Sequence, residues 1–150
     1  VNASWAGTSI RTHGAVHLSF GVALEDGLVT PVIRDAHAKT LKDIAIEAKA
    51  LIGKARSKKL TPGEMSGSTF TVTNLGMTGI DWFTPILNPP QIGIIGVSRV
   101  AQRPVVRDGQ LAVAPMTTLT LVFDHRAVDG YPAAQFLASV RERLESAEGQ

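Results

Sequence analysis

Apolar and polar positions form short runs that divide the chain into strands and two helices. The run AVHLSFGVAL at residues 15–24 is rich in strand-forming residues, and Glu25-Asp26-Gly27 separates it from the apolar run LVTPVI at residues 28–33. A glycine-containing turn between two such runs predicts a β-hairpin. Because Pro31 has no amide proton to donate, we expect the second strand to lie at a sheet edge or to leave its ladder there.

Two segments have the spacing of amphipathic helices. In the first, the Thr40 hydroxyl can cap the first turn and Asp43 can complete a capping box. The apolar positions that follow at helical spacing are Leu41, Ile44, Ala45, Ala48, Leu51, Ile52 and Ala55. The second helix is expected at residues 132–146, with an apolar face made of Ala133, Phe136, Leu137, Val140 and Leu144. Each helix therefore has one face to bury.

The remaining signals are short. Residues 61–64 predict a capped turn, and the run STFTVTN at residues 68–74 alternates as a strand does. The run IGIIGVSRV at residues 92–100 is typical of a strand covered on both faces. Apolar runs that end at Arg107 and extend from Gln110 to Asp124 flank Asp108-Gly109, which predicts a second hairpin. Strands with helices packed on them predict an α+β architecture.

Length and composition limit the possible functions. The 150 residues suit one domain, and 44% hydrophobic with 19% charged residues predict a folded chain. A net charge of +2 is too small for the basic field that nucleic-acid binding needs. No apolar run approaches the length of a membrane span, and no signal peptide is recognisable, so we expect no membrane partner. The chain starts with Val1, which predicts that it begins inside a longer protein.

The chain contains no cysteine, which excludes disulfides, thiolate zinc sites and a cysteine nucleophile. His13 and His17 have a spacing compatible with two metal ligands, but no third ligand is visible nearby, and we expect no metal. The lysine-rich segment from Lys39 to Lys59 could attract the phosphates of a ligand, but an ordinary solvated helix face is the interpretation we favour. We therefore do not place it in the site.

His125 has the neighbourhood that most suggests chemistry. The apolar run LTLVF leads directly into Asp124-His125-Arg126, and the second helix follows. A strand can thus hold an imidazole at its end while one edge stays accessible to substrate. Near neutral pH this imidazole can accept or donate a proton. The simpler interpretation is a surface histidine in a strand-to-helix turn.

The string DHRAVDG at residues 124–130 resembles the signature DHRxxDG of the dihydrolipoyl acyltransferases, the core components of 2-oxo acid dehydrogenase complexes. The resemblance covers essentially the whole chain, including GLVTPVIRDA, STFTVTNLGM and FTPILNPPQIGIIGVSRV. It implies a mixed β-sheet with packed helices, as in chloramphenicol acetyltransferase. It also implies that residues 1–150 are the C-terminal part of the catalytic domain, without the start of that domain, the lipoyl domain or the peripheral-subunit-binding domain.

The resemblance implies that His125 is the general base that deprotonates the thiol of coenzyme A. The thiolate then attacks the acyl thioester on dihydrolipoamide, so that both sulfur atoms belong to substrates. The family's usual serine before the NLG-like turn would stabilise the oxyanion, and Thr73 occupies that position. A threonine keeps the hydroxyl donor but is stiffer at χ1. Without the resemblance, Thr73 would be read as an ordinary strand residue.

The other expected site residues support these two. The resemblance implies that Asp129 completes the catalytic set, as a carboxylate that locks the segment through a buried ion pair or hydrogen bonds and does not transfer the proton. Arg126 is a partner for such a carboxylate or for Asp124. Asn74 and Gly76 are expected to shape the turn beside Thr73 by adopting positive φ. The supporting residues are Asn74, Gly76, Asp124, Arg126 and Gly130.

The resemblance also implies partners. Family members form trimers with the active site at the subunit boundary, and these trimers build 24-mer or 60-mer cores that work with lipoyl domains and dehydrogenase components. Coenzyme A and lipoamide are substrates, and no bound cofactor is expected. Acetyl is the acyl group we favour, and the cytoplasm, or the matrix in a mitochondrion, is the expected location. Two alternatives stay open: an inactive trimeric scaffold, and a free-standing acyltransferase with another acceptor.

Overall fold

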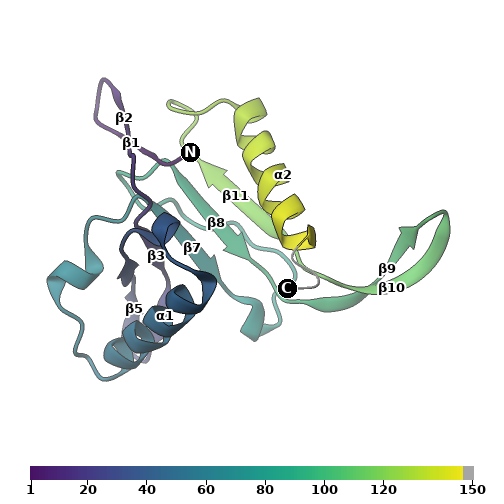
Figure 1. Ribbon diagram of the computed structural model, residues 1–150, viewed down its shortest axis with the longest axis horizontal. Coiled ribbons are helices and arrows are strands. Elements are labelled where there is room, and N and C mark those ends of the chain that lie inside the picture. The colour runs from purple at the N-terminus through teal and green to yellow at the C-terminus, as the bar shows by residue number, and fades with distance from the viewer. Residues whose placement is uncertain (147–150) are drawn as a thin grey trace.

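The computed structural model describes residues 1–146. Its centre is a five-stranded sheet in the order β11-β8-β7-β3-β6. The strands are β3 (Leu18–Phe20), β6 (Val32–Ile33), β7 (Phe70–Asn74), β8 (Gly93–Val97) and β11 (Leu119–Phe123). β7 runs parallel to β3 and β8, whereas β6 and β11 run antiparallel to their neighbours. The predicted mixed sheet is confirmed, and α1 (Leu41–Arg56) and α2 (Gly130–Ser146) pack on it (Figure 1).

Shorter elements surround this sheet. They are β1 (Ala3–Trp5), β2 (Ile10–Thr12), β4 (Val22–Leu24), β5 (Gly27–Val29), β9 (Ala101–Arg107), β10 (Gln110–Met116) and the 3-10 turns η1 (Ala36–Ala38), η2 (Pro62–Met65) and η3 (Gly76–Thr78). β1 with β2, β4 with β5, and β9 with β10 form two-stranded ladders. In the part of the chain that the structure describes, neither helix has the length and apolar character to cross a bilayer.

The hairpin predicted at residues 15–33 is confirmed, but each arm is divided between two sheets. β4 and β5 form the tip, while β3 and β6 pair within the central sheet. β6 is one of the two edge strands of that sheet, as the proline next to it predicts. The carbonyl of Pro31 still accepts a hydrogen bond from the amide of Phe20 at 3.1 Å. Backbone hydrogen bonding between the two arms therefore continues at Pro31, with the proline carbonyl as the acceptor.

Helix α1 starts as predicted. The Thr40 hydroxyl accepts from the amide of Asp43, and the Asp43 carboxylate accepts from the amide of Thr40, which completes the capping box. The predicted apolar face is wrong at its beginning, because Leu41 is 83% exposed. The buried residues of the helix are Leu51 and Ala55, near its end. The helix packs on β4 and β6 and is covered only in that second half.

The second predicted hairpin is confirmed in part. β9 and β10 pair along their whole length and project away from the body of the molecule (Figure 1). The predicted single run from 110 to 124 is wrong, because it divides after Met116 and its second half returns to the central sheet as β11. The Thr117 hydroxyl donates to the carbonyl of Ser98 at 2.9 Å and fixes the crossing point.

The two faces of the sheet are covered differently. On one face, Phe70 packs edge-on against Phe136 of α2, with ring centroids 5.8 Å apart. Thr71 and Thr73 point to the other face, because alternate residues of a strand share a side. There the segment after η3 covers the sheet, and a Cβ added at Gly96 would lie 2.9 Å from the Phe83 ring. The face that carries Thr73 is therefore closed by a loop and not by a helix.

Helix α2 begins at Gly130, two residues before the predicted start, and its predicted apolar face holds at Ala133, which is 2% exposed. The prediction is wrong at Leu144, which is 56% exposed. The helix packs on β11. The segment that joins the strand to the helix is short and carries the DHRAVDG string. This arrangement brings His125 to the end of β11, an edge strand of the central sheet.

Candidate active site

The segment that carries His125 is a tight turn anchored at its first residue. The amide of Asp124 donates to the carbonyl of Ile92 at 3.0 Å. The carbonyl of Asp124 accepts from the amides of Ala127 and Val128, at 3.0 and 3.1 Å. The side chain of His125 is 72% exposed, and its ring lies 5.7 Å from that of Phe123. A rigid backbone thus presents an imidazole that a bound substrate can reach.

Arg126 pairs with Asp124. Its Nε lies 2.9 Å from Oδ1 and a terminal nitrogen lies 2.6 Å from Oδ2, while its amide also donates to Oδ1. The hydrogen bond from the Arg126 side chain, followed by that from its amide, lowers the pKa of Asp124 to about 2. The guanidinium also lies 4.8 Å from the centroid of the Trp5 ring. These contacts hold the residues on both sides of His125.

This pairing predicts a pH-dependent stability. Because the pKa of Asp124 is lowered in the folded protein, its contribution is complete above about pH 4 and is lost as the pH falls toward 2. The gap in the free energy of unfolding between the wild type and Asp124→Asn should therefore narrow over that range in urea titrations. When both proteins also carry Arg126→Gln, the difference in the free energy of unfolding caused by Asp124→Asn should depend less on pH. A gap that is equally wide at pH 2 and pH 6 would contradict the assignment.

Asp129 is not the buried lock that we expected. Its carboxylate is 84% exposed, and Oδ1 lies 3.7 Å from Nδ1 of His125, which is beyond hydrogen-bond distance. Its carbonyl accepts from the amide of Ala133 at 3.2 Å and begins α2. The expectation of burial is wrong for the single chain, because nothing in residues 1–146 covers this side of the turn. Gly130, next to it, has no atom within 4 Å of an added Cβ.

Thr73 lies at the other predicted position of the site and lines a cavity of about 350 Å³. Its hydroxyl would be 3.5 Å from a Cβ added at Gly21. Thr71, on the same face, is 3% exposed, and its hydroxyl is engaged with Ser19 and Gln91 at 2.7 Å each. This buried hydrogen-bond network holds β7 in place at Thr71, two residues before Thr73.

The turn after Thr73 differs from our expectation. Asn74 and Gly76 do not adopt positive φ, and the left-handed glycine of this loop is Gly79, with φ of 80°. Instead, Oδ1 of Asn74 accepts from the amide of Gly76 at 2.8 Å. A Cβ at Gly76 would lie 3.0 Å from the carbonyl of Ser98. The glycine is therefore required for close packing and not for an unusual backbone conformation.

His125 and Thr73 lie at opposite ends of the sheet. Phe123 pairs with Gly93 of β8, whereas Thr73 pairs with Gly96 of the same strand. This offset of three residues is about 10 Å along the strands. Because β8 lies between β11 and β7, the two strands are also about two strand spacings apart. Phe123 and Thr73 are therefore separated by about 14 Å. The chain then continues away from Thr73 toward His125. One copy of the chain therefore cannot bring the two side chains to the same reacting group of a substrate.

The two histidines and the lysine-rich segment that we did not place in the site make hydrogen bonds and ion pairs of their own. Nε2 of His13 lies 2.6 Å from the hydroxyl of Ser4, and Nδ1 of His17 accepts from the amide of Asp35 at 3.1 Å. Within residues 1–146 no group of three or more potential metal ligands converges. In the lysine-rich segment Lys39 pairs with Glu47, Lys54 with Glu64 and Lys58 with Asp26. These pairs fit a solvated helix face.

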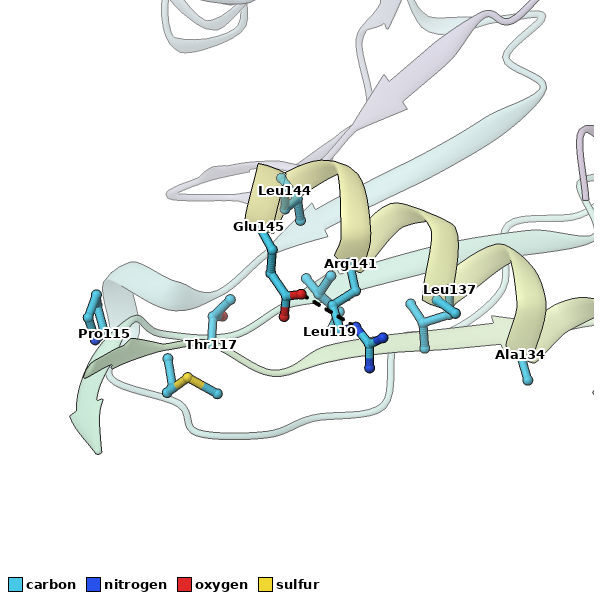
Figure 2. Close-up of a pocket in the computed structure, with 10 residues that line it drawn as sticks. Pro115, Thr117, Leu119, Ala134, Leu137, Arg141, Leu144 and Glu145 are labelled. Carbon is cyan, nitrogen blue, oxygen red and sulfur yellow. Dashed lines mark ion pairs between the residues drawn. The ribbon is translucent and has the colours of Figure 1, made fainter. Parts of the chain in front are cut away.

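Sequence reasoning did not find the residues that form the cavity next to Thr73. Leu28 belongs to β5, and Phe83 and Pro85 belong to the loop before β8. The cavity is made by segments far apart in the sequence, and no local pattern marks such residues. A larger cavity of about 450 Å³ lies between α2 and the strands β10 and β11 (Figure 2). Neither His125 nor Thr73 lines it.

Comparisons with known proteins agree with the resemblance in the sequence. Residues 1–149 match the family described as 2-oxoacid dehydrogenases acyltransferase (catalytic domain). The chain is 48% identical over 145 residues to the dihydrolipoyllysine-residue acetyltransferase component of the pyruvate dehydrogenase complex of Rickettsia bellii, covering 97% of this chain and 35% of that protein. The chain thus spans about a third of the length of this relative.

Solved structures share the fold. A probable dihydrolipoamide acetyltransferase from Listeria monocytogenes superposes with a TM-score of 0.95 at 39% identity, over 99% of this chain and 64% of that chain. A dihydrolipoamide acetyltransferase from Azotobacter vinelandii gives a TM-score of 0.88 at 42% identity, over 93% and 58%. In the Azotobacter protein, the roles of a serine, a histidine and an asparagine in the catalytic mechanism were investigated.

Proposed function

The chain belongs to the family of 2-oxoacid dehydrogenase acyltransferases, as part of their catalytic domain, and we propose that it transfers an acyl group between dihydrolipoamide and coenzyme A. The observation that carries this proposal is the geometry of His125. A hydrogen-bonded turn holds the imidazole at the end of β11, an edge strand of the central sheet, and leaves it 72% exposed. A general base for a diffusible thiol needs this combination of fixed position and access.

In the proposed reaction His125 takes the proton from the thiol of coenzyme A. The thiolate forms a bond to the carbonyl carbon of the acyl-dihydrolipoamide thioester, and the carbonyl oxygen becomes an oxyanion that the Thr73 hydroxyl stabilises. The intermediate collapses, the bond from carbon to the dihydrolipoamide sulfur breaks, and the proton passes from His125 to that sulfur. The products are acyl-coenzyme A and free dihydrolipoamide.

The spacing of the site residues supports these roles. The serine, histidine and asparagine studied in the Azotobacter enzyme have the same spacing along the chain as Thr73, His125 and Asp129. Thr73 keeps a hydroxyl where that enzyme has serine. Asp129 has a carboxylate where that enzyme has asparagine, and its Oδ1 lies 3.7 Å from Nδ1 of His125, so we assign Asp129 to electrostatic positioning of the imidazole. Asn74, Gly76, Asp124, Arg126 and Gly130 shape the two turns around these residues.

The separation of His125 from Thr73 supports a homotrimer in which each site lies between two copies. One copy then supplies the base and its neighbour supplies the hydroxyl, and symmetry repeats the arrangement three times. We further propose that the trimers form a 24-mer or 60-mer core that serves lipoyl domains and dehydrogenase components. The named relatives are bacterial, which supports a cytoplasmic location.

A direct assay tests this function. The intact protein should convert acetyl-dihydrolipoamide and coenzyme A to acetyl-coenzyme A, measured by chromatography of the thioester product. The solution mass of the same sample should be that of a trimer or a multiple of it. A trimer without transfer would favour the alternative of an assembly scaffold. Transfer to an acceptor other than coenzyme A would favour a free-standing acyltransferase.

A further inference from the structure

Uncharged side chains line the cavity beside Thr73. We propose that this cavity holds the acyl chain of the thioester and that its uncharged lining selects acyl groups without a carboxylate. The inference rests on the proposed function, because it requires that the Thr73 hydroxyl meets the thioester oxygen. A carbonyl oxygen hydrogen-bonded to Thr73 places the acyl substituent within a few ångströms of the hydroxyl, at the cavity that Thr73 lines.

The size of the cavity does not provide the selection. Its volume of about 350 Å³ is at the lower end of the range of about 300–1,000 Å³ in which proteins bind small molecules. It has room for a chain of four carbons together with part of the thioester carrier. An acetyl, a butyryl and a succinyl group therefore all fit by volume. Discrimination must come from the chemistry of the lining.

The lining is apolar with a few neutral polar groups. Leucine, isoleucine, phenylalanine, proline, glycine, threonine and asparagine line the cavity, and no lysine, arginine or histidine does. Of the threonines, Thr71 is already engaged with Ser19 and Gln91. A succinyl carboxylate inside the cavity would thus lose water without gaining a cationic partner from the side chains of this copy that line it, which is strongly unfavourable.

Nearby cations are already paired. Arg99 follows β8 at the end of the sheet where Thr73 lies, and it binds both carboxylate oxygens of Asp81, at 2.7 and 3.0 Å. Arg103 pairs with the same carboxylate. Lys58, near the tip of the β4–β5 hairpin, pairs with Asp26 at 2.8 Å. None of these three cations lines the cavity, and each is held by a carboxylate outside it.

Three dihydrolipoamide thioesters provide the test on the intact wild-type protein. Butyryl has the four-carbon chain of succinyl without its carboxylate, so this pair separates charge from size. We expect kcat/KM for succinyl to be at least about 100-fold below that for acetyl, with butyryl much closer to acetyl. If butyryl and succinyl are equally poor, size is the determinant and the inference is wrong. If succinyl equals acetyl, the inference is also wrong, although acyl transfer itself stands.

A cation introduced at the rim should relax the selection. Leu28 is 67% exposed, and its Cδ1 and the Thr73 hydroxyl would each lie 3.5 Å from a Cβ at Gly21. In Leu28→Arg we expect the succinyl-to-butyryl ratio of kcat/KM to rise about fivefold, as for an ion pair at an exposed site. The matched control is Leu41→Arg, at a leucine that is 83% exposed on α1 and does not line the cavity. An unchanged succinyl-to-butyryl ratio in active Leu28→Arg, or an equal rise of this ratio in the control, would overturn the inference.

Loss of transfer of all three acyl groups in the wild type would instead overturn the proposed function.

Discussion

Replacing His125 with alanine is expected to lower the rate of acyl transfer to coenzyme A by about 100-fold or more. The thiol of coenzyme A is mostly protonated near neutral pH, so the reaction needs a base that removes its proton as the new bond to carbon forms. His125 is held for this role by the turn on either side of it and is 72% exposed. The measurement is kcat/KM for acetyl-coenzyme A formation by the intact protein.

A matched histidine variant separates this effect from a general loss of structure. His37 is an exposed histidine of η1, and His37→Ala should transfer acyl groups at the wild-type rate. Urea unfolding of His125→Ala should be close to that of the wild type, because the side chain makes no hydrogen bond within 3.5 Å to Asp129 and is largely in solvent. A His125→Ala protein with normal turnover would remove the proposed general base.

Much of the fold could be predicted because its signals are local. The capping boxes at Thr40 and Thr61, and the turn at Asp108-Gly109, each depend on residues within four positions of one another. The pairing of Arg126 with Asp124 is local in the same sense. The sequence therefore contains both partners of each interaction, and their spacing is enough to predict the contact.

The errors arise where distant segments decide the outcome. The two arms of the first hairpin divide between sheets because β3 and β6 join β7 in the central sheet, whereas β4 and β5 pair only with each other. Leu41 and Leu144 have the spacing of the apolar faces of their helices, but they lie beyond the part of each helix that the rest of the chain covers. Gly76 is needed because the backbone at Ser98 passes close to it, which local sequence does not reveal. The cavity beside Thr73 could not be predicted for the same reason.

Removing the hydroxyl of Thr73 should lower the rate of acyl transfer by a factor similar to that expected for removing the base. Thr73→Val keeps the branched shape that β7 favours but has no donor for the oxyanion, and loss of such a donor reduces kcat by about 100-fold to 1,000-fold. Thr73→Ser keeps the donor and should stay within about tenfold of the wild type, since only a methyl group is lost. Equal activity of the valine and serine variants, measured as kcat for acetyl transfer, would exclude the hydroxyl from catalysis.

Mixing the two inactive variants tests whether the base and the hydroxyl come from different copies. Phe123 and Thr73 are about 14 Å apart within one chain, so an intact site needs His125 of one copy and Thr73 of another. In randomly mixed trimers of His125→Ala and Thr73→Val chains, three quarters contain both variants, and each of these has one intact site out of three. Co-expression should therefore restore about a quarter of the wild-type activity. Sites formed within one chain would instead leave the mixture as inactive as either variant alone, because every site would then carry one of the two substitutions.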